Sequence, residues 1–198
     1  MSLKASSLQI PPTLSAKIFH PLHTVRCTGP AVFRNQLARD VACLLDVDED
    51  VTSWSCLPGA YSYGGESYRP DFIAERYGRS TVVDVAAVGE RPVWLKDVVT
   101  AAGHCLETFE RGDLPVIRLK NGRDLLRYAR YEVGLDDRVR LMAALDENGS
   151  LTVAECMPAF RAIPPMAGLA SLILSRFVTI DLDHAPIGPE TNVRRLRG

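Results

Sequence analysis

Two aspartates that lie thirteen residues apart are the strongest constraint on what this chain can fold into. Asp71 follows Pro70 at the start of one apolar run, and Asp84 lies within the next, Thr81–Ala86. A glycine-containing turn separates the runs, so we expect them to pair as an antiparallel hairpin. That pairing would bring both carboxylates to one edge of a sheet, where they offer the hard oxygen ligands that Mg²⁺ prefers.

Composition sets the broad class of protein. The chain has 198 residues, 46% of them hydrophobic and 24% charged, which suits one large or two small globular domains. A net charge of −1 excludes a protein covered in positive potential, although a local basic face would suffice to bind DNA. No apolar run approaches the length of about 20 residues that spans a bilayer. The five cysteines are scattered without a CxxC pair, which favours reduced thiols and a cytoplasmic protein.

The first two thirds of the chain are expected to form an arm and then an α/β unit. Residues 1–30 contain four prolines and no periodicity, so we interpret them as an N-terminal arm. An antiparallel meander followed by a helical crossover predicts a mixed sheet within residues 31–135. The predicted helices and strands follow the order αβββαβα, at 31–47, 51–57, 66–77, 80–87, 93–109, 114–119 and 121–133.

Residues 136–198 are expected to form a second, mainly α-helical unit. Short helices are predicted at 137–145, 153–160 and 166–174, and a strand at 177–182. A polar tail with several arginines closes the sequence. Three short helices followed by a strand are typical of a winged-helix module, in which a helix-turn-helix packs on a small sheet.

Three stretches of the chain fit one family pattern in order and spacing. They are Leu37–Leu45 with Asp50-Val51, the hairpin Tyr68–Ala86, and Gly149–Thr152 with Phe177–Leu182 and Thr191–Val193. Together they resemble TnsA, the endonuclease subunit of heteromeric transposons, which belongs to the PD-(D/E)xK restriction-endonuclease-like superfamily. The resemblance implies a DNA-binding protein with an αβββαβ mixed-sheet core and a winged-helix-like C-terminal domain. It also implies two partners, a transposase that cuts the other strand and an ATPase regulator.

The resemblance implies a Mg²⁺ site at Asp71, Asp84 and the backbone carbonyl of Val85. There the metal would polarise a scissile phosphate and lower the pKa of an attacking water. Two positions depart from the family pattern: Ala38 replaces an acidic residue of the first helix, and Ala86 replaces the lysine after the second carboxylate. Because losing one electrostatic donor costs about 10²–10³ in rate, we expect an impaired nuclease site.

An active Mg²⁺-dependent endonuclease is the alternative interpretation. Lys96, early in the second predicted helix, would then reach back to the carboxylates and replace the missing lysine. On a purely structural interpretation, Lys96 is a solvated helix residue and Asp71 caps a turn. Asp84 would then pair with an arginine such as Arg69 or Arg91.

Basic residues supply a candidate DNA-binding surface. One precedes the third predicted helix, three lie within it and two lie in the tail: Lys120, Arg123, Arg127, Arg130, Arg194 and Arg195. The arginines of the helix are spaced to share one face, where they would contact phosphates. An ordinary solvated face and a disordered tail are the alternatives. A third hypothesis is therefore a protein-interaction module without DNA binding, and the oligomeric state stays open, with a homodimer among the options.

Overall fold

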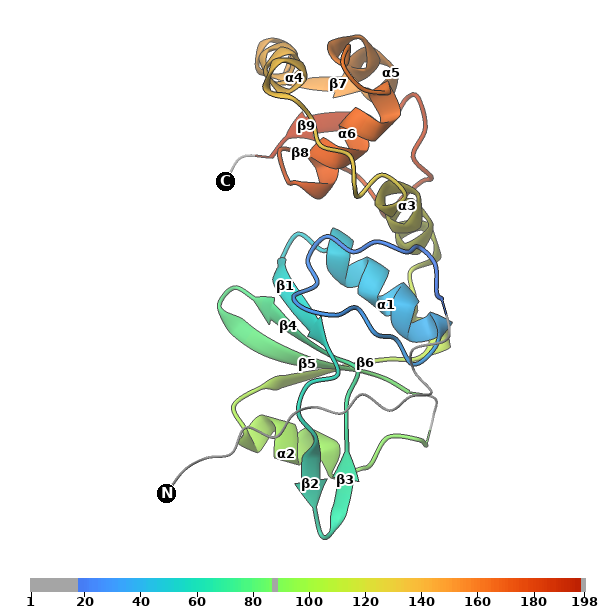
Figure 1. Ribbon diagram of the computed structural model, residues 1–198, viewed down its shortest axis with the longest axis vertical. Coiled ribbons are helices and arrows are strands. Elements are labelled where there is room, and N and C mark those ends of the chain that lie inside the picture. The colour runs from blue at the N-terminus through green and yellow to red at the C-terminus, as the bar shows by residue number, and fades with distance from the viewer. Residues whose placement is uncertain (1–17, 87–88, 197–198) are drawn as a thin grey trace.

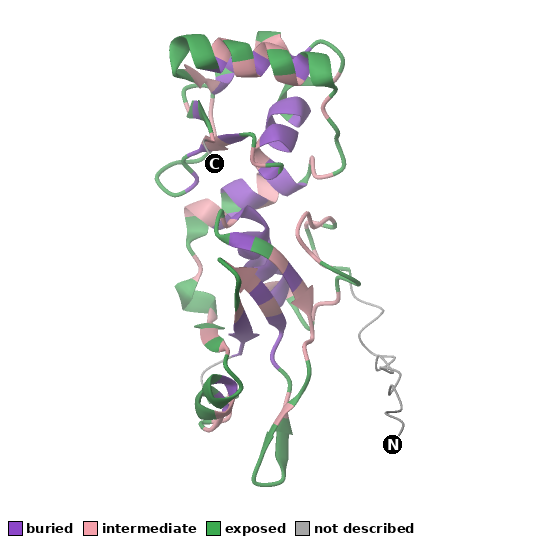
Figure 2. Ribbon diagram, turned by 90° about the vertical axis from the view of Figure 1, so that its left-hand side faces the viewer, coloured by how far each residue is buried: buried purple, intermediate pink, exposed green. Residues whose placement is uncertain are grey.

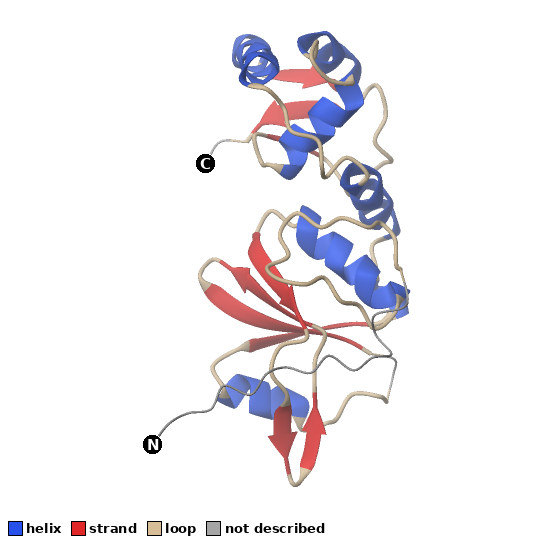
Figure 3. Ribbon diagram, viewed as in Figure 1, coloured by secondary structure: helices blue, strands red, loops and turns tan. Residues whose placement is uncertain are grey.

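The computed structural model describes residues 18–86 and 89–196, so most of the predicted arm lies outside the described residues. The first half of the described chain builds a sheet with helices around it (Figures 1 and 3). Within the described residues, no helix has both the length and the apolarity that a bilayer-spanning helix requires. The elements of this half are α1 (Gln36–Val47), β1 (Val51–Cys56), β2 (Tyr61–Tyr63), β3 (Glu66–Tyr68), β4 (Phe72–Arg76), β5 (Arg79–Val85), α2 (Leu95–Ala101), β6 (Cys105–Phe109) and α3 (Val116–Leu126).

The main sheet is mixed, with strand order β1-β4-β5-β6. β1 pairs antiparallel with β4, and β4 pairs antiparallel with β5, whereas β6 runs parallel to β5. Parallel neighbours need a crossover, and α2 supplies it. α1 and α2 lie on opposite sides of the sheet in Figure 1. The predicted mixed sheet with an antiparallel meander and a helical crossover is therefore confirmed.

The helix predicted at 93–109 is wrong, because this segment is a helix followed by a strand. α2 ends at Ala101, and Gly103 adopts a φ of +83°, a conformation that glycine reaches without a steric penalty. The amide of His104 then donates to the carbonyl of Val99 at 3.1 Å, which closes the helix end. The chain leaves this turn as β6, the strand that lies parallel to β5.

The strand predicted at 114–119 is also wrong, because α3 begins within it. Pro115 occupies the cap position and Val116 is the first helical residue. Proline suits a helix start because its fixed φ is close to the helical value and its missing N–H is not needed there. The predicted helix at 121–133 is correspondingly shifted, since α3 ends at Leu126.

The strand predicted at 66–77 is interrupted at Pro70, so that β3 and β4 belong to different sheets. β3 pairs with β2 in a separate two-stranded hairpin. Gly64 and Gly65 form its turn with φ values of 58° and 87°, as tight hairpin turns require. The hairpin projects beyond the main sheet and is largely exposed (Figure 2).

The C-terminal part of the chain forms a helical unit closed by a small sheet. Its three strands have the order β7-β9-β8, and both pairs are antiparallel. The segment expected to be a polar tail is β9, the central strand of this sheet, which corrects that prediction. The elements are α4 (Leu135–Asn148), β7 (Ser150–Thr152), α5 (Val153–Cys156), α6 (Pro165–Leu174), β8 (Val178–Ile180) and β9 (Asn192–Arg195).

α1 is buried on both sides and joins the two halves of the molecule. It begins at Gln36 rather than at residue 31, because the Asn35 side chain caps it by accepting from the amide of Ala38 at 2.9 Å. Every residue from Ala38 to Val47 is buried. One side, including Val41, packs on the sheet, while Leu44 on another side packs in an apolar cluster with α3 and the C-terminal unit. The two halves therefore share a core through α1.

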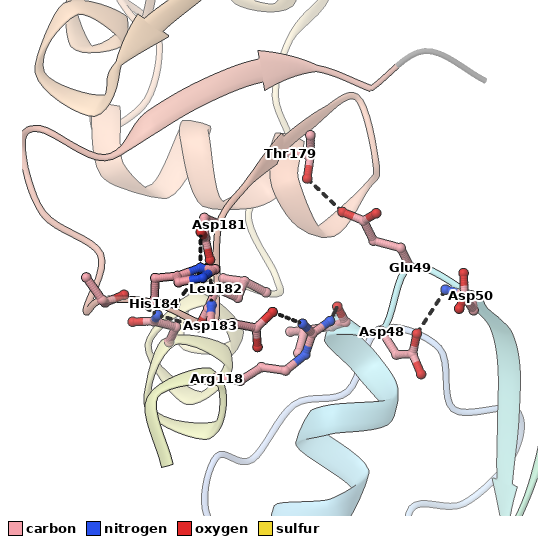
Figure 4. A network of polar contacts seen from close by, with 12 residues as sticks. Asp48, Glu49, Asp50, Arg118, Thr179, Asp181, Leu182, Asp183 and His184 are labelled. Carbon is pink, nitrogen blue, oxygen red and sulfur yellow. Dashed lines mark hydrogen bonds and ion pairs between the residues drawn. The ribbon is translucent and has the colours of Figure 1, made fainter. Parts of the chain in front are cut away.

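A polar seam continues this contact at the surface (Figure 4). Thr179 of β8 donates to Glu49, in the α1–β1 turn, at 2.7 Å. Arg118 of α3 pairs with Asp183 at 2.9 Å and also donates to the carbonyl of Val47 at 3.2 Å. Side chains from three distant segments therefore fix the position of the C-terminal unit against α1.

We predict that Gly168→Ala destabilises the fold. A Cβ at this position in α6 would come within 2.3 Å of the Phe160 ring, which is buried with 5% exposed, so the ring would have to shift. Overpacking of this kind costs about 1–3 kcal/mol of unfolding free energy, measurable by urea denaturation. Gly112→Ala is the control, because nothing lies within 4 Å of its added Cβ. Equal stability of the two variants would contradict the predicted clash.

Candidate functional site

Asp71 and Asp84 lie side by side at one end of the β4–β5 hairpin. Phe72 opposes Val83 in the antiparallel register, so the two aspartates occupy the next facing positions. Both residues are buried, with 2% of Asp71 and 0% of Asp84 exposed. The hairpin thus brings together the two carboxylates that the sequence singled out.

Arg34, from the segment before α1, holds the first carboxylate with two parallel contacts. Its Nε donates to Asp71 Oδ1 at 2.7 Å, and its Nη2 donates to Oδ2. The backbone amide of Val85 donates to the same Oδ2 at 2.8 Å. A bidentate guanidinium and a backbone amide therefore occupy both oxygens of Asp71, the strongest kind of neutralisation that a side chain provides.

Asp84 is held from the other side by a second arginine and a tyrosine. Arg91 Nε donates to its Oδ2 at 2.7 Å. The hydroxyl of Tyr68 lies 3.0 Å from Oδ1 and 3.2 Å from Oδ2. Arg34 also approaches this carboxylate, with Nη2 3.7 Å from Oδ1. The pairing of Asp84 with Arg91 is one of the partners that the sequence suggested.

Two carboxylates and two guanidinium groups make this cluster neutral overall. Burial is the largest influence on Asp71 and raises its pKa, while the contacts from Arg34 and the Val85 amide act in the opposite direction. Burial and the nearby negative charge of Asp84 together raise the pKa of Tyr68 to about 12. Tyr68 therefore stays protonated as a hydrogen-bond donor at neutral pH.

The donor set fits a resident Mg²⁺ poorly. Mg²⁺ needs carboxylate oxygens that are free to coordinate it, whereas the oxygens of Asp71 and Asp84 already accept from arginines, a tyrosine and an amide. In the part of the chain that the structure describes, no three His, Cys, Asp or Glu side chains gather as a potential metal group. A metal ion would have to share these oxygens with their present donors or displace some of them.

Lys96 lies in the first turn of α2 and is exposed. Its backbone carbonyl accepts from the Thr100 hydroxyl at 2.8 Å. Across residues 18–86 and 89–196, no hydrogen bond or ion pair joins its ammonium group to Asp71 or Asp84. The displaced-lysine role stays a prediction that this arrangement does not favour.

The basic residues predicted to share one helix face do not all lie on α3. Arg127 is the cap residue after Leu126, and Arg130 follows in the turns beyond it. Lys120 pairs with Asp124 at 3.0 Å. Because α3 ends at Leu126, no single helix in the described residues carries the predicted i, i+4, i+7 stripe.

Arg123, in the middle of this group, forms an ion pair with a residue of α1. Arg123 pairs with Asp40 at 2.5 Å. By contrast, the side chain of Arg127 is 73% exposed, and its contact with Asp124 is 3.5 Å long. Both arginines line an open cleft of about 700 Å³ between α1 and α3, together with Arg111 and Lys120.

The two arginines of the supposed tail belong to β9. Arg194 opposes Ser150 and Thr179 in the small sheet. Arg195 forms an ion pair with Asp146 of α4, with Nη1 2.6 Å from Oδ1. Their backbones therefore lie in the central strand of a sheet, while both side chains are exposed.

A search of protein-family models finds no match to this chain, and a search of curated proteins finds none either. The resemblance to TnsA therefore stays a prediction from the sequence.

Sequence reasoning missed Arg34 and Tyr68 as members of the site. Arg34 was included in the predicted first helix, and it has no fixed spacing from the aspartates that would have marked it. Tyr68 was included in a long predicted strand, and its contact with Asp84 depends on the interruption at Pro70. Contacts over such separations depend on the tertiary fold.

We predict that Asp71→Ala lowers the unfolding free energy by about 1–3 kcal/mol, the typical cost of leaving buried hydrogen-bonding groups without a partner. The reason is that Arg34 and the Val85 amide would lose their acceptor in a buried site. Urea denaturation of the variant and of Glu147→Ala, an exposed carboxylate on α4, supplies the comparison. A loss no greater than that of the control would show that the ion pair contributes little.

Proposed function

We propose that this chain is a TnsA-like DNA-transaction protein, related to transposition, whose nuclease-like site holds arginines in place of a metal. It binds DNA, a transposition partner, or both, and it cuts DNA poorly or not at all. The observation that carries this proposal is the pairing of Asp71 with Arg34 and of Asp84 with Arg91.

The architecture supports the restriction-endonuclease-like part of the proposal. The strands β1, β4 and β5 form an antiparallel meander, and α2 leads to the parallel strand β6. α1 precedes them and packs on the sheet. This αβββαβ order is the one that the family resemblance implies, and the paired carboxylates lie at the expected hairpin. Fold alone does not fix activity, so the argument for function depends on the site.

The arginines explain how the site persists without its usual partners. Ala86 and Ala38 supply neither the lysine nor the helix acid of the family pattern. Two carboxylates this close repel each other unless a cation lies between or beside them. Arg34 bridges both, so a guanidinium supplies the charge that a metal ion would otherwise supply. The cluster is then structurally satisfied but lacks a centre that activates water.

Exposed arginines provide the proposed contacts with DNA phosphates. Arg127 borders the cleft between α1 and α3, and Arg130 is exposed just beyond it. Arg194 is exposed on β9. Phosphate contacts from such side chains supply affinity without sequence preference.

The C-terminal unit favours a second candidate function, protein binding. Its order, α4-β7-α5-α6-β8-β9 with β9 central, supports the winged-helix-like proposal. In helix-turn-helix proteins the second helix of the pair enters the major groove. Here that helix is α6, which contains no charged residue and buries Ala167–Leu172 and Leu174. We therefore propose that α6 is not a recognition helix and that this unit, apart from Arg194, contacts a transposase or an ATPase regulator.

We predict no metal-dependent nicking of supercoiled plasmid at a few mM Mg²⁺ or Mn²⁺, above the level of Asp71→Ala. The arginines occupy the oxygens that a catalytic metal would need. Nicking that requires the metal, and that disappears in Asp71→Ala and in Lys96→Ala, would overturn the proposal in favour of an active endonuclease.

We predict salt-sensitive binding to duplex DNA. In Arg127→Ala and Arg130→Ala, each lost phosphate contact should reduce the slope of log K against log salt by about 0.9. Arg79→Ala is the matched control, because Arg79 is exposed at the turn end of the β4–β5 hairpin, away from the carboxylates. Fluorescence anisotropy at several salt concentrations gives the slopes. Absence of any DNA binding would leave the protein-interaction function.

A further inference from the structure

Cys27 lies beside β1, held there by backbone pairing. It forms a parallel bridge with Trp54. The amide of Trp54 donates to the carbonyl of Arg26 at 3.0 Å, and the amide of Thr28 donates to the carbonyl of Trp54 at 2.7 Å. The segment before α1 therefore runs along β1 as a short added strand.

The register brings a second cysteine to the same face. Side chains alternate along a strand, so Cys56, two residues beyond Trp54, points to the same side as Trp54. Residues that oppose each other in a bridge also share a face, which places Cys27 on this side. Both cysteines are half-buried and border the apolar cluster under α1.

The two sulfurs have different environments. The Cys56 sulfur accepts from the backbone amide of Val32 at 3.3 Å. The Cys27 thiol donates to the carbonyl of Gly29 at 3.8 Å. Its interaction with the neighbouring Cys56 lowers the pKa of Cys56 and raises that of Cys27. Among the charged neighbours of Cys56, Asp71 raises its pKa and Arg39 lowers it. The contact from the Val32 amide favours a thiolate at Cys56, so Cys56 is the thiol that we expect to react first.

We propose that Cys27 and Cys56 form an oxidisable dithiol, a modification site that reacts with small-molecule disulfides. The Cys56 thiolate attacks the reagent and forms a mixed disulfide, and one reagent thiolate leaves. Cys27 then loses its proton and displaces the second reagent thiolate, which closes a Cys27–Cys56 disulfide. The pair loses two electrons and two protons, and the reagent is reduced to two thiols.

This cross-link would act on the segment that reaches the carboxylate cluster. Cys27 lies on the described stretch that continues to Val32 and to Arg34, the partner of Asp71. A disulfide would tether this stretch covalently to β1. The dithiol therefore offers chemical control over the segment that supplies a guanidinium to the two aspartates, and it stands independently of the proposed function.

The test uses the full chain with Cys105→Ser, because Cys105 is exposed and would react by itself. Cys43 and Cys156 are buried and should stay unreacted in the native protein. The probe is an aromatic disulfide whose thiol product absorbs visible light. We expect two equivalents of product per chain, a mass two hydrogens lower and no retained reagent.

Removing one thiol should trap the first intermediate. Cys27→Ser in the Cys105→Ser background should release one equivalent of product and keep one reagent group on Cys56. Peptide mapping of the oxidised parent should recover a Cys27–Cys56 cross-linked peptide. The proposal fails if the parent retains the reagent, releases no product or cross-links another pair. These outcomes are all measured on the Cys105→Ser protein, so the test remains valid even if the Cys27→Ser variant does not fold.

Discussion

The burial of α1 on both sides is the constraint on which the rest of the structure depends. A helix that packs on a sheet alone keeps a polar face toward water, but ten consecutive residues of α1 are buried. Val41 faces the sheet, and Leu44 faces α3 and the C-terminal unit. The sheet that carries the two aspartates and the helical unit beyond it are therefore parts of one packed body.

Buried polar groups of α1 determine what lies along it. Arg39 donates to the carbonyls of Pro21 and His23, each at 2.7 Å. Asp46 accepts from the amide of Arg26 at 3.0 Å and from the Trp54 indole at 2.9 Å. Unsatisfied polar groups inside a protein are costly, so these contacts oblige the preceding segment to wrap along α1. Arg34 lies on the same segment, which is how it comes to meet Asp71.

The local sequence pattern predicted the β4–β5 hairpin and the position of its two aspartates. Two apolar runs and the turn between them are enough to define such a hairpin. The local pattern failed between residues 93 and 119, where short apolar runs fit a helix or a strand equally. Gly103 and Pro115 mark the true helix end and the true helix start, and giving them more weight would have found both. The sequence could not predict that Arg34 is the partner of Asp71, because this contact depends on how α1 and the segment before it pack on the sheet.

The wrapped segment also bears on the order in which the molecule can assemble during synthesis. Arg26 donates through both Nη atoms to the carbonyl of Leu174 at 3.3 Å, a contact between residues separated by 148 positions. The ribosome delivers Arg26 long before Leu174. Chains begin folding from the N-terminus as they emerge, so this contact can form only after the chain through Leu174 has left the ribosome. Until then, the segment that bears Arg34 lacks one of the contacts that hold it beside the aspartates.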